Sequence, residues 1–327
     1  MVDESTGHIF AIIGLGKIGG NLAHQALAKG LRVAGYTLGG PPADLIDQGL
    51  IGLDKLDALR TALPPPRRVF LYIPAGPAVD ETLDALSAIL EPGDIIVDGG
   101  NSYWGDSIRR HHRAAEAGFN FVDMGTSGGL DGAHDGACFM VGGDADAFSA
   151  IEPILRALSV EHGYVHAGPA GAGHYAKLVH NGIEFGMLQA IAEGVSLLDA
   201  HHTPLPVGDI LRCWTHGSVI RSWLIELMAE GYAKTDGLAN TPPWIEDTGE
   251  VNWLVQDAMD MEVPIPVISQ SVMQLFASRD DRRVWARAIA AMRHGFGGHP
   301  FGHDEAIRRG RTTSRVGMLW RDPQRSR

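Results

Sequence analysis

The chain has 327 residues, 45% of them hydrophobic and 20% charged, a composition typical of one large or two medium compact domains. Its formal net charge of −12 argues against nucleic acid as the main partner, and no apolar run approaches the roughly 18 residues that a membrane span requires. The start of the chain is acidic and polar, unlike a signal or transit peptide, and two cysteines are too few for a disulfide framework, so we expect a cytoplasmic protein.

The first half of the chain alternates short apolar runs with helical stretches. Continuous apolar residues predict buried strands at residues 8–13, 32–37, 67–73, 94–98 and 120–124. Helical patterns such as NLAHQALAKG and VDETLDALSAIL lie between these runs. This alternation predicts an α/β fold of the Rossmann type, with a doubly wound and mainly parallel sheet.

A glycine motif, Gly14-x-Gly16-x-x-Gly19, directly follows the first predicted strand, and Lys17 and Ile18 begin the next helix. At such a turn the glycines permit a tight bend and a close approach of a pyrophosphate, which the helix N-terminus attracts. The motif therefore predicts that this segment binds a dinucleotide.

The end of the second predicted strand bears on which dinucleotide is bound. NAD-binding proteins place an acid there for the ribose hydroxyls, whereas NADP-binding proteins have an arginine nearby for the 2′-phosphate. Here Thr37 occupies the position of the acid, and no arginine follows at once. Both NAD and NADP remain open, and NADP is slightly favoured because no carboxylate would repel its phosphate.

Two polar, glycine-rich segments follow the fourth and fifth predicted strands, at the sheet edge where ligands bind in such folds. DGGNS contains Asn101 and Ser102, and GTSGG contains Ser127, Gly128 and Gly129. The backbone N–H groups of GTSGG and the Ser127 hydroxyl suit a carboxylate or a hydroxyl group of a ligand. A purely structural loop remains the alternative for GTSGG, but a plain turn does not explain Asn101 together with Ser102.

The strand pattern fades after AGPAGAG at residues 167–173, and the remainder is helical to about residue 299, with breaks at TPPW and VPIP. We predict a dinucleotide-binding domain at 1–166 and an all-α domain for substrate binding and dimerisation at 167–327. The chain ends in a basic tail, which is either solvated or an arm that packs on a partner subunit. The arginines of this tail are Arg308, Arg309, Arg311, Arg315, Arg321, Arg325 and Arg327.

The segment KLVHNGIE places Lys177, His180, Asn181 and Glu184 at i, i+3, i+4 and i+7, so a helix stacks them on one face. A lysine in apolar surroundings near a nicotinamide can act as a general base, and a buried glutamate as a general acid. His180 and Asn181 between them can bind substrate oxygens. We predict a catalytic stripe.

Two other interpretations of this helix are weaker. A solvated Lys–Glu face is disfavoured by the apolar residues on both sides, and Gly182 and Gly186 indicate close packing because they cost helix stability. His180 and Glu184 have a spacing that can hold a metal, but no further ligand motif accompanies them, so we expect no metal site.

Five motifs together resemble the decarboxylating 6-phosphogluconate dehydrogenases, a family of the β-hydroxyacid dehydrogenase superfamily, and particularly their short bacterial form. The motifs are GLGKIGGN, DGGNS, GTSGGLDGAHDG, GHYAKLVHNGIEFGMLQAIAEG and FGGH, and they span most of residues 8–300. The resemblance implies NAD(P)-dependent oxidation and decarboxylation of a sugar acid. It also implies a Rossmann domain, a helical domain with a long central helix, and a homodimer in which the C-terminal segment completes the partner's site.

The resemblance also assigns roles to matching positions. Lys177 would take the proton from the C3 hydroxyl and later stabilise the enolate oxygen, and Glu184 would protonate C1 of the enediol. Asn101 would border the nicotinamide ribose and the substrate, and Arg293 and His299 would lie near the phosphate end. The carboxylate end and hydroxyls would be held by Ser127, Gly128, Gly129, His180 and Asn181.

The sequence departs from the family pattern where the substrate phosphate is bound. Phe185 replaces a tyrosine, Asn252 and Leu254 replace a basic residue and a threonine, and Leu275 replaces an arginine. Each lost charge-assisted contact costs about 1.5–3 kcal/mol. We therefore expect retained chemistry on an aldonate whose distal end lacks the phosphate or differs, and the apolar replacements suggest a less charged end. Alternatively, other arginines replace the lost contacts, from among Arg279, Arg282, Arg283 and the tail.

Three other functions stay open. The first is the ordinary 6-phosphogluconate dehydrogenase reaction, which gives ribulose 5-phosphate. The second is reduction of a ketone or imine without decarboxylation. The third is dinucleotide binding without catalysis.

Overall fold

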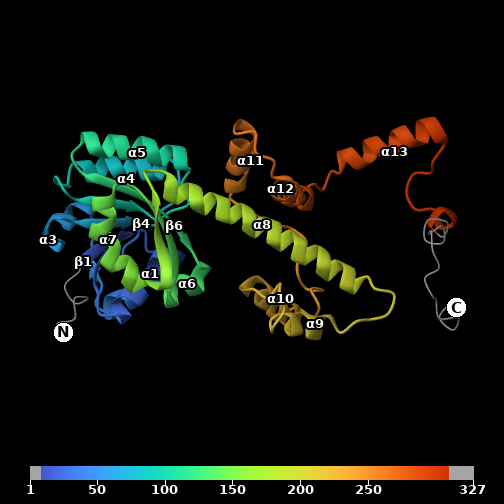
Figure 1. The fold of residues 1–327 in the computed structure, drawn as a ribbon, viewed down its shortest axis with the longest axis horizontal. Helices are drawn as coiled ribbons and strands as arrows, with labels where there is room; N and C mark the ends of the chain where they lie inside the picture. Colours follow the sequence, from blue (N-terminus) through green and yellow to red (C-terminus); the bar gives the residue numbers. More distant parts are fainter. Residues whose placement is uncertain (1–8, 309–327) are drawn as a thin grey trace. The chain divides into compact units, whose positions relative to one another are not determined.

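The computed structural model describes residues 9–308, which begin with an eight-stranded sheet flanked by helices (Figure 1). The strand order is β3-β2-β1-β4-β5-β6-β7-β8, and neighbours are parallel except β6 with β7. The order of the first six strands is that of a Rossmann fold, so the predicted fold class is confirmed. The strands are β1 (Ile9–Ile13), β2 (Arg32–Tyr36), β3 (Ile51–Gly52), β4 (Arg68–Leu71), β5 (Ile95–Asp98), β6 (Asn120–Ser127), β7 (Ala137–Gly142) and β8 (Ser159–Gly168).

Helices cover both faces of this sheet, because successive side chains of each strand point to opposite sides. Phe10 and Ile12 of β1 belong to the core beneath α1, α6 and α7, whereas Ile9, Ala11 and Ile13 belong to the core beneath α3, α4 and α5. The helices are α1 (Lys17–Ala28), α2 (Ala43–Asp47), α3 (Leu59–Ala62), α4 (Pro77–Ser87), α5 (Trp104–Glu116), α6 (Gly129–Asp135) and α7 (Ala145–Leu158).

All five predicted strands are present, but the sequence did not reveal β3, β7 and β8. β8 is an edge strand in which most residues are partly or fully exposed, so it lacks the continuous apolar run of a central strand. The prediction that Gly125–Ser127 form a loop after the fifth strand is wrong. These residues continue β6, because they pair antiparallel with β7, where Ser127 lies opposite Cys138.

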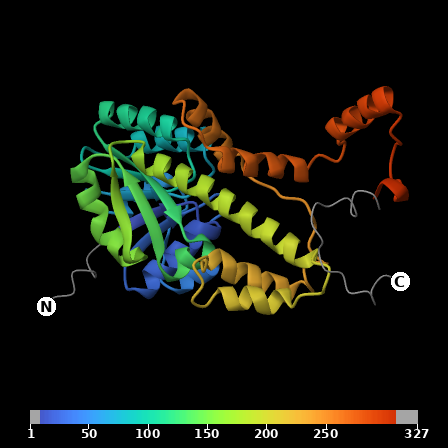
Figure 2. The same ribbon diagram turned by 45° about the vertical axis from the view of Figure 1, so that its right-hand side comes forward.

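The second half is helical, as predicted, with one break that contains TPPW and one at VPIP, whose last residue begins α12. The helices are α8 (Ala172–Asp199), α9 (Val207–Trp214), α10 (Trp223–Lys234), α11 (Glu250–Asp260), α12 (Pro266–Ser278) and α13 (Val284–Gly297). The distal half of α8 packs against α9 and α10 through Val195, Val207 and Leu211 (Figure 2). Among residues 9–308, no helix combines the length and the apolar character that crossing a membrane requires.

The chain forms two compact units. One contains the sheet, α8 to α11 and the residues from Glu246 to Met273, and the other contains Pro243–Ile245 with the residues from Gln274 onward. The division therefore falls within α12 and places α13 in the second unit. The tail arginines from Arg309 onward lie outside the described residues.

Candidate functional site

A cleft of about 1240 Å³ opens at the carboxyl ends of β1, β4, β5 and β6, and the stripe of α8 forms part of its wall. The strand order reverses between β1 and β4, and such switch points are where doubly wound sheets bind ligands. The volume exceeds the roughly 300–1,000 Å³ of a site for one small molecule, so the cleft has room for a dinucleotide and a substrate. The predicted residues in its wall are Gly16, Lys17, Ile18, Asn101, Ser127, Gly128, Gly129, Lys177, His180, Asn181 and Glu184.

The turn between β1 and α1 fits the pyrophosphate of a dinucleotide. Gly14 has φ +95°, and a Cβ there would overlap the carbonyl oxygen of Tyr72, while a Cβ at Gly19 would overlap the Gly14 carbonyl. These two glycines therefore shape the turn and the approach of the helix to the strand. Residues 16–18 face the cleft, and a Cβ at Gly16 would meet nothing within 4 Å. The first turn of α1 carries no acidic side chain that would repel an anion.

The N-terminus of α8 is held on the sheet by one buried carboxylate. Asp123 of β6 is fully buried and accepts hydrogen bonds from the backbone N–H groups of Gly171, at 2.7 Å, and His174, at 2.8 Å. A negative group at this end also interacts favourably with the helix dipole. Because Lys177 follows His174 by one turn of the helix, Asp123 fixes the position from which the lysine reaches the cleft.

Glycines bring α8 into close contact with the strands beneath it. A Cβ at Gly125 of β6 would overlap the Cβ of Lys177, and a Cβ at Gly173 would lie 2.6 Å from the Asp123 carbonyl oxygen and the Gly142 nitrogen. Such approaches are possible only without side chains. The glycines therefore seat the base of the lysine side chain directly on the sheet.

The four polar residues of α8 form a connected group with the end of β6. The Lys177 Nζ lies 3.4 Å from His180 Nδ1, and the Ser127 Oγ lies 3.1 Å from His180 Nε2. The Asn181 Oδ1 and a carboxylate oxygen of Glu184 lie 3.3 and 3.9 Å from His180 Nδ1. The structure thus brings together the predicted base, the predicted acid and the serine of GTSGG.

Burial lowers the pKa values of two members of this group, Lys177 and His180. Burial lowers the pKa of Lys177 below the usual lysine value, although the negative charges of Glu184, Cys138 and Glu250 oppose the shift. Burial also lowers the pKa of His180, and the nearby positive charge of Lys177 adds to this effect. A lowered pKa makes the neutral amine, which can accept a proton, more accessible near physiological pH.

Several cleft residues were not identified from the sequence. Glu250 begins α11, Trp223 begins α10, and Cys138 lies on β7, so each comes from an element whose position relative to α8 the sequence does not specify. Tyr72 follows β4, its hydroxyl lies 3.1 Å from Thr126 Oγ1, and burial raises its pKa. Only Tyr72 carried a signal, since it ends a predicted strand at the ligand-binding edge.

Gly14 and Gly19 shape the turn without lining the cleft, and three other predicted site residues among residues 9–308 lie outside the cleft wall. Thr37 directly follows β2 but is not part of the cleft wall. Arg293 of α13 and His299 belong to the second unit, where Arg293 Nη2 lies 3.5 Å from His299 Nδ1.

The apolar replacements at Phe185 and Leu254 lie in a hydrophobic cluster with Leu178, Val251 and Val272, not in the cleft wall. A Cβ at Gly182 would overlap the side chain of Leu254, so the absence of a side chain at Gly182 allows this packing. The sequence predicted close packing here, because a glycine inside a helix otherwise only costs stability. Leu254 therefore packs against α8 and does not line the cleft, and a less charged distal end of the substrate stays a prediction.

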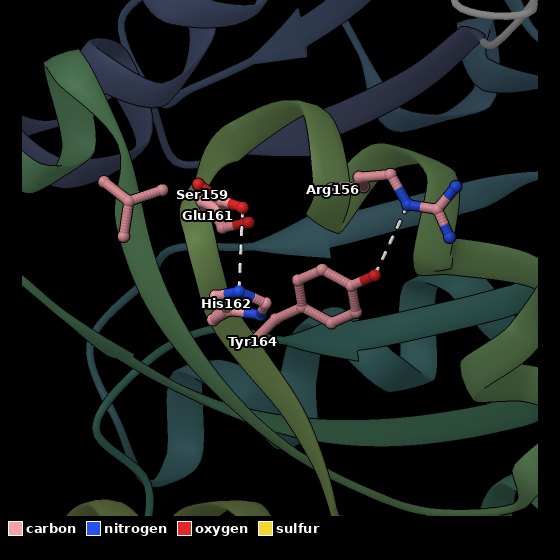
Figure 3. A pocket seen from close by; sticks show the side chains of 6 residues that line it. Arg156, Ser159, Glu161, His162 and Tyr164 are labelled. Atoms are coloured by element: carbon pink, nitrogen blue, oxygen red, sulfur yellow. Dashed lines mark hydrogen bonds and ion pairs between the residues drawn. The ribbon is translucent and has the colours of Figure 1, made fainter.

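A second hollow, of about 400 Å³, lies between α7 and β8 (Figure 3). The Tyr164 hydroxyl accepts a hydrogen bond from Arg156 Nε, at 3.4 Å, and donates one to Glu152, at 2.8 Å. His162 Nε2 lies 3.6 Å from Glu161 Oε1, and both side chains are almost fully exposed. Because these charged groups pair with one another on an open surface, we place the functional site in the larger cleft.

The chain is similar to known proteins over most of its length. Residues 9–168 match the family described as the NAD-binding domain of 6-phosphogluconate dehydrogenase, and residues 173–309 match the C-terminal domain of that enzyme. The chain is 41% identical over 289 residues to YqeC of Bacillus subtilis, covering 88% of this chain and 97% of YqeC. It is 38% identical over 291 residues to an NAD(+)-dependent, decarboxylating 6-phosphogluconate dehydrogenase of Haloferax volcanii, covering 88% and 96%.

A solved structure shows the same similarity. The 6-phosphogluconate dehydrogenase of Plasmodium falciparum, determined in its apo form and with NADP+ and with 6-phosphogluconate, aligns with a TM-score of 0.75 at 28% identity. The alignment covers 91% of this chain and 67% of that one.

Proposed function

Because the chain belongs to the 6-phosphogluconate dehydrogenase family of NAD(P)-dependent decarboxylating oxidoreductases, we propose that it oxidatively decarboxylates a β-hydroxy sugar acid in the cleft beside α8. The observation that carries this proposal is the convergence of Lys177, His180 and Glu184 with Ser127 on one wall of the cleft.

The side chains divide the reaction between them. A bound nicotinamide supplies the hydride acceptor. Lys177, as a neutral amine, takes the proton of the C3 hydroxyl as C3 is oxidised, and the resulting β-keto acid loses CO2 because the new ketone accepts the electron pair. Protonated Lys177 then stabilises the enolate oxygen, and Glu184 delivers a proton to the former C2 of the sugar acid, the carbon that has lost the carboxylate and becomes C1 of the product. Ser127, His180 and Asn181 hold the carboxylate end and hydroxyls of the substrate.

The test is a panel of sugar acids with both dinucleotides, in which reduced nicotinamide and CO2 are measured together. Equal amounts of the two products with any aldonate support the proposal. Reduced nicotinamide without CO2 indicates a non-decarboxylating dehydrogenase or reductase. Dinucleotide binding without turnover of any substrate indicates a binding protein.

The same panel tests the distal end of the substrate. Asn252 is exposed at the start of α11, and Leu254 is buried in the hydrophobic cluster, so neither supplies the positive charge that suits a phosphate. We propose that the activity on gluconate or another aldonate, divided by the activity on 6-phosphogluconate, is higher for this chain than for its relatives. A micromolar KM for 6-phosphogluconate would instead support the ordinary activity of the family.

Replacing Glu184 by glutamine is expected to lower kcat by about 10²–10³-fold, because the amide cannot deliver the proton to the carbon that has lost the carboxylate. The KM of the substrate should change little, since glutamine keeps nearly the same shape. Glu193, which is exposed on the same helix and accepts a hydrogen bond from Gln189 at 2.8 Å, provides the control. Glu193→Gln should keep the parent kcat within about twofold, and equal kcat values for the two variants would remove Glu184 from the mechanism.

We further propose that the chain is a homodimer whose C-terminal segment completes the partner's site. On α13 the apolar side chains of Trp285, Ile289, Met292 and Phe296 are exposed, and their spacing places them on one face of the helix. Such a face is typical of a surface that another chain covers. Light scattering should give a mass of about twice 35.0 kDa, and Phe296→Asp should lower it towards that of one chain. A parent protein that stays monomeric at micromolar concentration contradicts this proposal.

A further inference from the structure

One buried guanidinium links two loops of the cleft from behind. Arg110 of α5 is fully buried. It donates a hydrogen bond, at 3.0 Å, to the carbonyl oxygen of Gly76, the last residue of the loop after β4. It also donates one to Ser102 Oγ, at 3.3 Å, in the loop after β5. These two loops contribute Pro74 and Asn101 to the cleft wall.

Two carboxylates complete this network. Asp80 of α4 accepts hydrogen bonds from Arg110 Nε, at 3.1 Å, and Nη2, at 3.0 Å, and these bonds lower the pKa of the Asp80 carboxyl well below its usual range. Asp98, fully buried at the end of β5, lies 3.6 Å from Arg110 Nη1. Its oxygens accept hydrogen bonds from Ser102 Oγ, at 2.7 Å, and from the Gly100 nitrogen, at 3.1 Å. The loop that carries Asn101 is therefore bonded on both sides of that residue.

Stability alone is a weak explanation for such a network. The cost of taking charges out of water can exceed their attraction, and apolar residues of similar volume often stabilise a protein as well or better. A buried, planar guanidinium instead fixes the distance and orientation of every group that it bonds. Here it bonds both a loop after β4 and a loop after β5, directly behind the cleft.

We propose that Arg110 is a positioning residue, which holds the loops after β4 and β5 at the spacing that the bound dinucleotide requires. This inference rests on the proposed function only for the identity of the ligand class. The network acts without touching the ligand, because Asn101 and Pro74 face the cleft while Arg110 lies behind them.

The experiment compares Arg110→Lys and Arg110→Met with Arg109→Met. Arg109 is the matched control, because it also bonds Asp80, at 3.1 and 3.0 Å, but its side chain is 52% exposed and it bonds neither loop. For each folded variant, the Kd of NAD and NADP is measured by calorimetry, together with kcat and KM. We expect both Arg110 variants to weaken dinucleotide binding by about 10- to 100-fold, the loss that follows removal of a residue supporting the ligands of a metal site. Arg109→Met should stay within about twofold of the parent.

A second variant guards against loss of folding. Ser102→Ala keeps the ion pairs of Arg110 and removes the link to the Asn101 loop, so we expect a several-fold rise in the dinucleotide Kd with an unchanged acid limb of the pH–rate profile. A further variant, Arg110→Ala, lacks the guanidinium, and millimolar guanidinium in solution should partly restore its dinucleotide binding. Parent-like Kd values in Arg110→Lys, Arg110→Met and Ser102→Ala would overturn the proposal. The binding measurement separates this result from failure of the proposed reaction, which would appear as absent CO2 release in the parent protein.

Discussion

Replacing Lys177 by methionine is expected to lower kcat by about 10³-fold or more, with little change in the free energy of unfolding. Methionine keeps the stem that packs on Gly125 but removes the amine that, in the proposed mechanism, accepts the substrate proton. A positioned acid–base group typically contributes about 10²–10⁴-fold, and in this mechanism one amine serves both the oxidation and the decarboxylation. Steady-state kinetics with the best substrate of the panel, alongside urea unfolding, measures both quantities.

The pH–rate profile of the parent provides a second test of Lys177. Because burial lowers its pKa below the usual 10.5, the amine becomes neutral, and able to act as a base, at a lower pH than an ordinary lysine. The logarithm of kcat/KM should therefore rise with pH through an acid limb below pH 10.5 and then level off. This limb should be absent from Lys177→Met. The same shift makes the folded protein bind the proton less tightly than the unfolded chain does, so the lysine's contribution to stability becomes more favourable as pH rises through this range.

Lys29→Met is the matched control for this variant. Burial also lowers the pKa of Lys29, but its amine donates to the carbonyl of Ala157, at 2.7 Å, away from the cleft. Its kcat should stay close to that of the parent. A Lys177→Met protein with parent kcat would remove the lysine from catalysis and favour the non-catalytic binding function.

Replacing Asp123 by alanine is expected to lower the free energy of unfolding by about 2–5 kcal/mol, because two buried N–H groups at the start of α8 lose their acceptor. The variant should also lose activity, since Lys177 follows this turn of the helix. Urea unfolding curves, with kcat measured under conditions in which the variant is folded, test both effects. Asp123→Asn should be milder, because the amide oxygen still accepts one bond.

Asp144 provides the comparison for Asp123. It also stands at a helix N-terminus, that of α7, but its side chain is 65% exposed and accepts no capping bond among the described residues. Asp144→Ala should therefore cost less than about 1 kcal/mol. Equal unfolding midpoints for the two alanine variants would mean that Asp123 does not anchor α8.

The sequence by itself determined the features that depend on spacing within one element. A helix has 3.6 residues per turn, so the spacing of Lys177, His180 and Glu184 fixed a common face before any tertiary contact was known. In the same way, the glycines after the first strand specified a turn that no other residue adopts as readily. Continuous apolar runs specified central strands, but they could not reveal β8, whose residues are mostly exposed at the sheet edge.

Only the tertiary structure decided which neighbours these elements meet. Glu250 and Cys138 face the cleft because α11 and β7 pack beside α8. Leu254 is buried because its side chain packs against Gly182 of α8. Neither result depends on local sequence, because residues far apart in the chain set the distance between elements. The spacing of a helix is a property of its backbone, whereas the wall of a cleft is a property of packing. For that reason the polar stripe of α8 was readable from the sequence, and the residues that α11 and β7 add to the cleft wall were not.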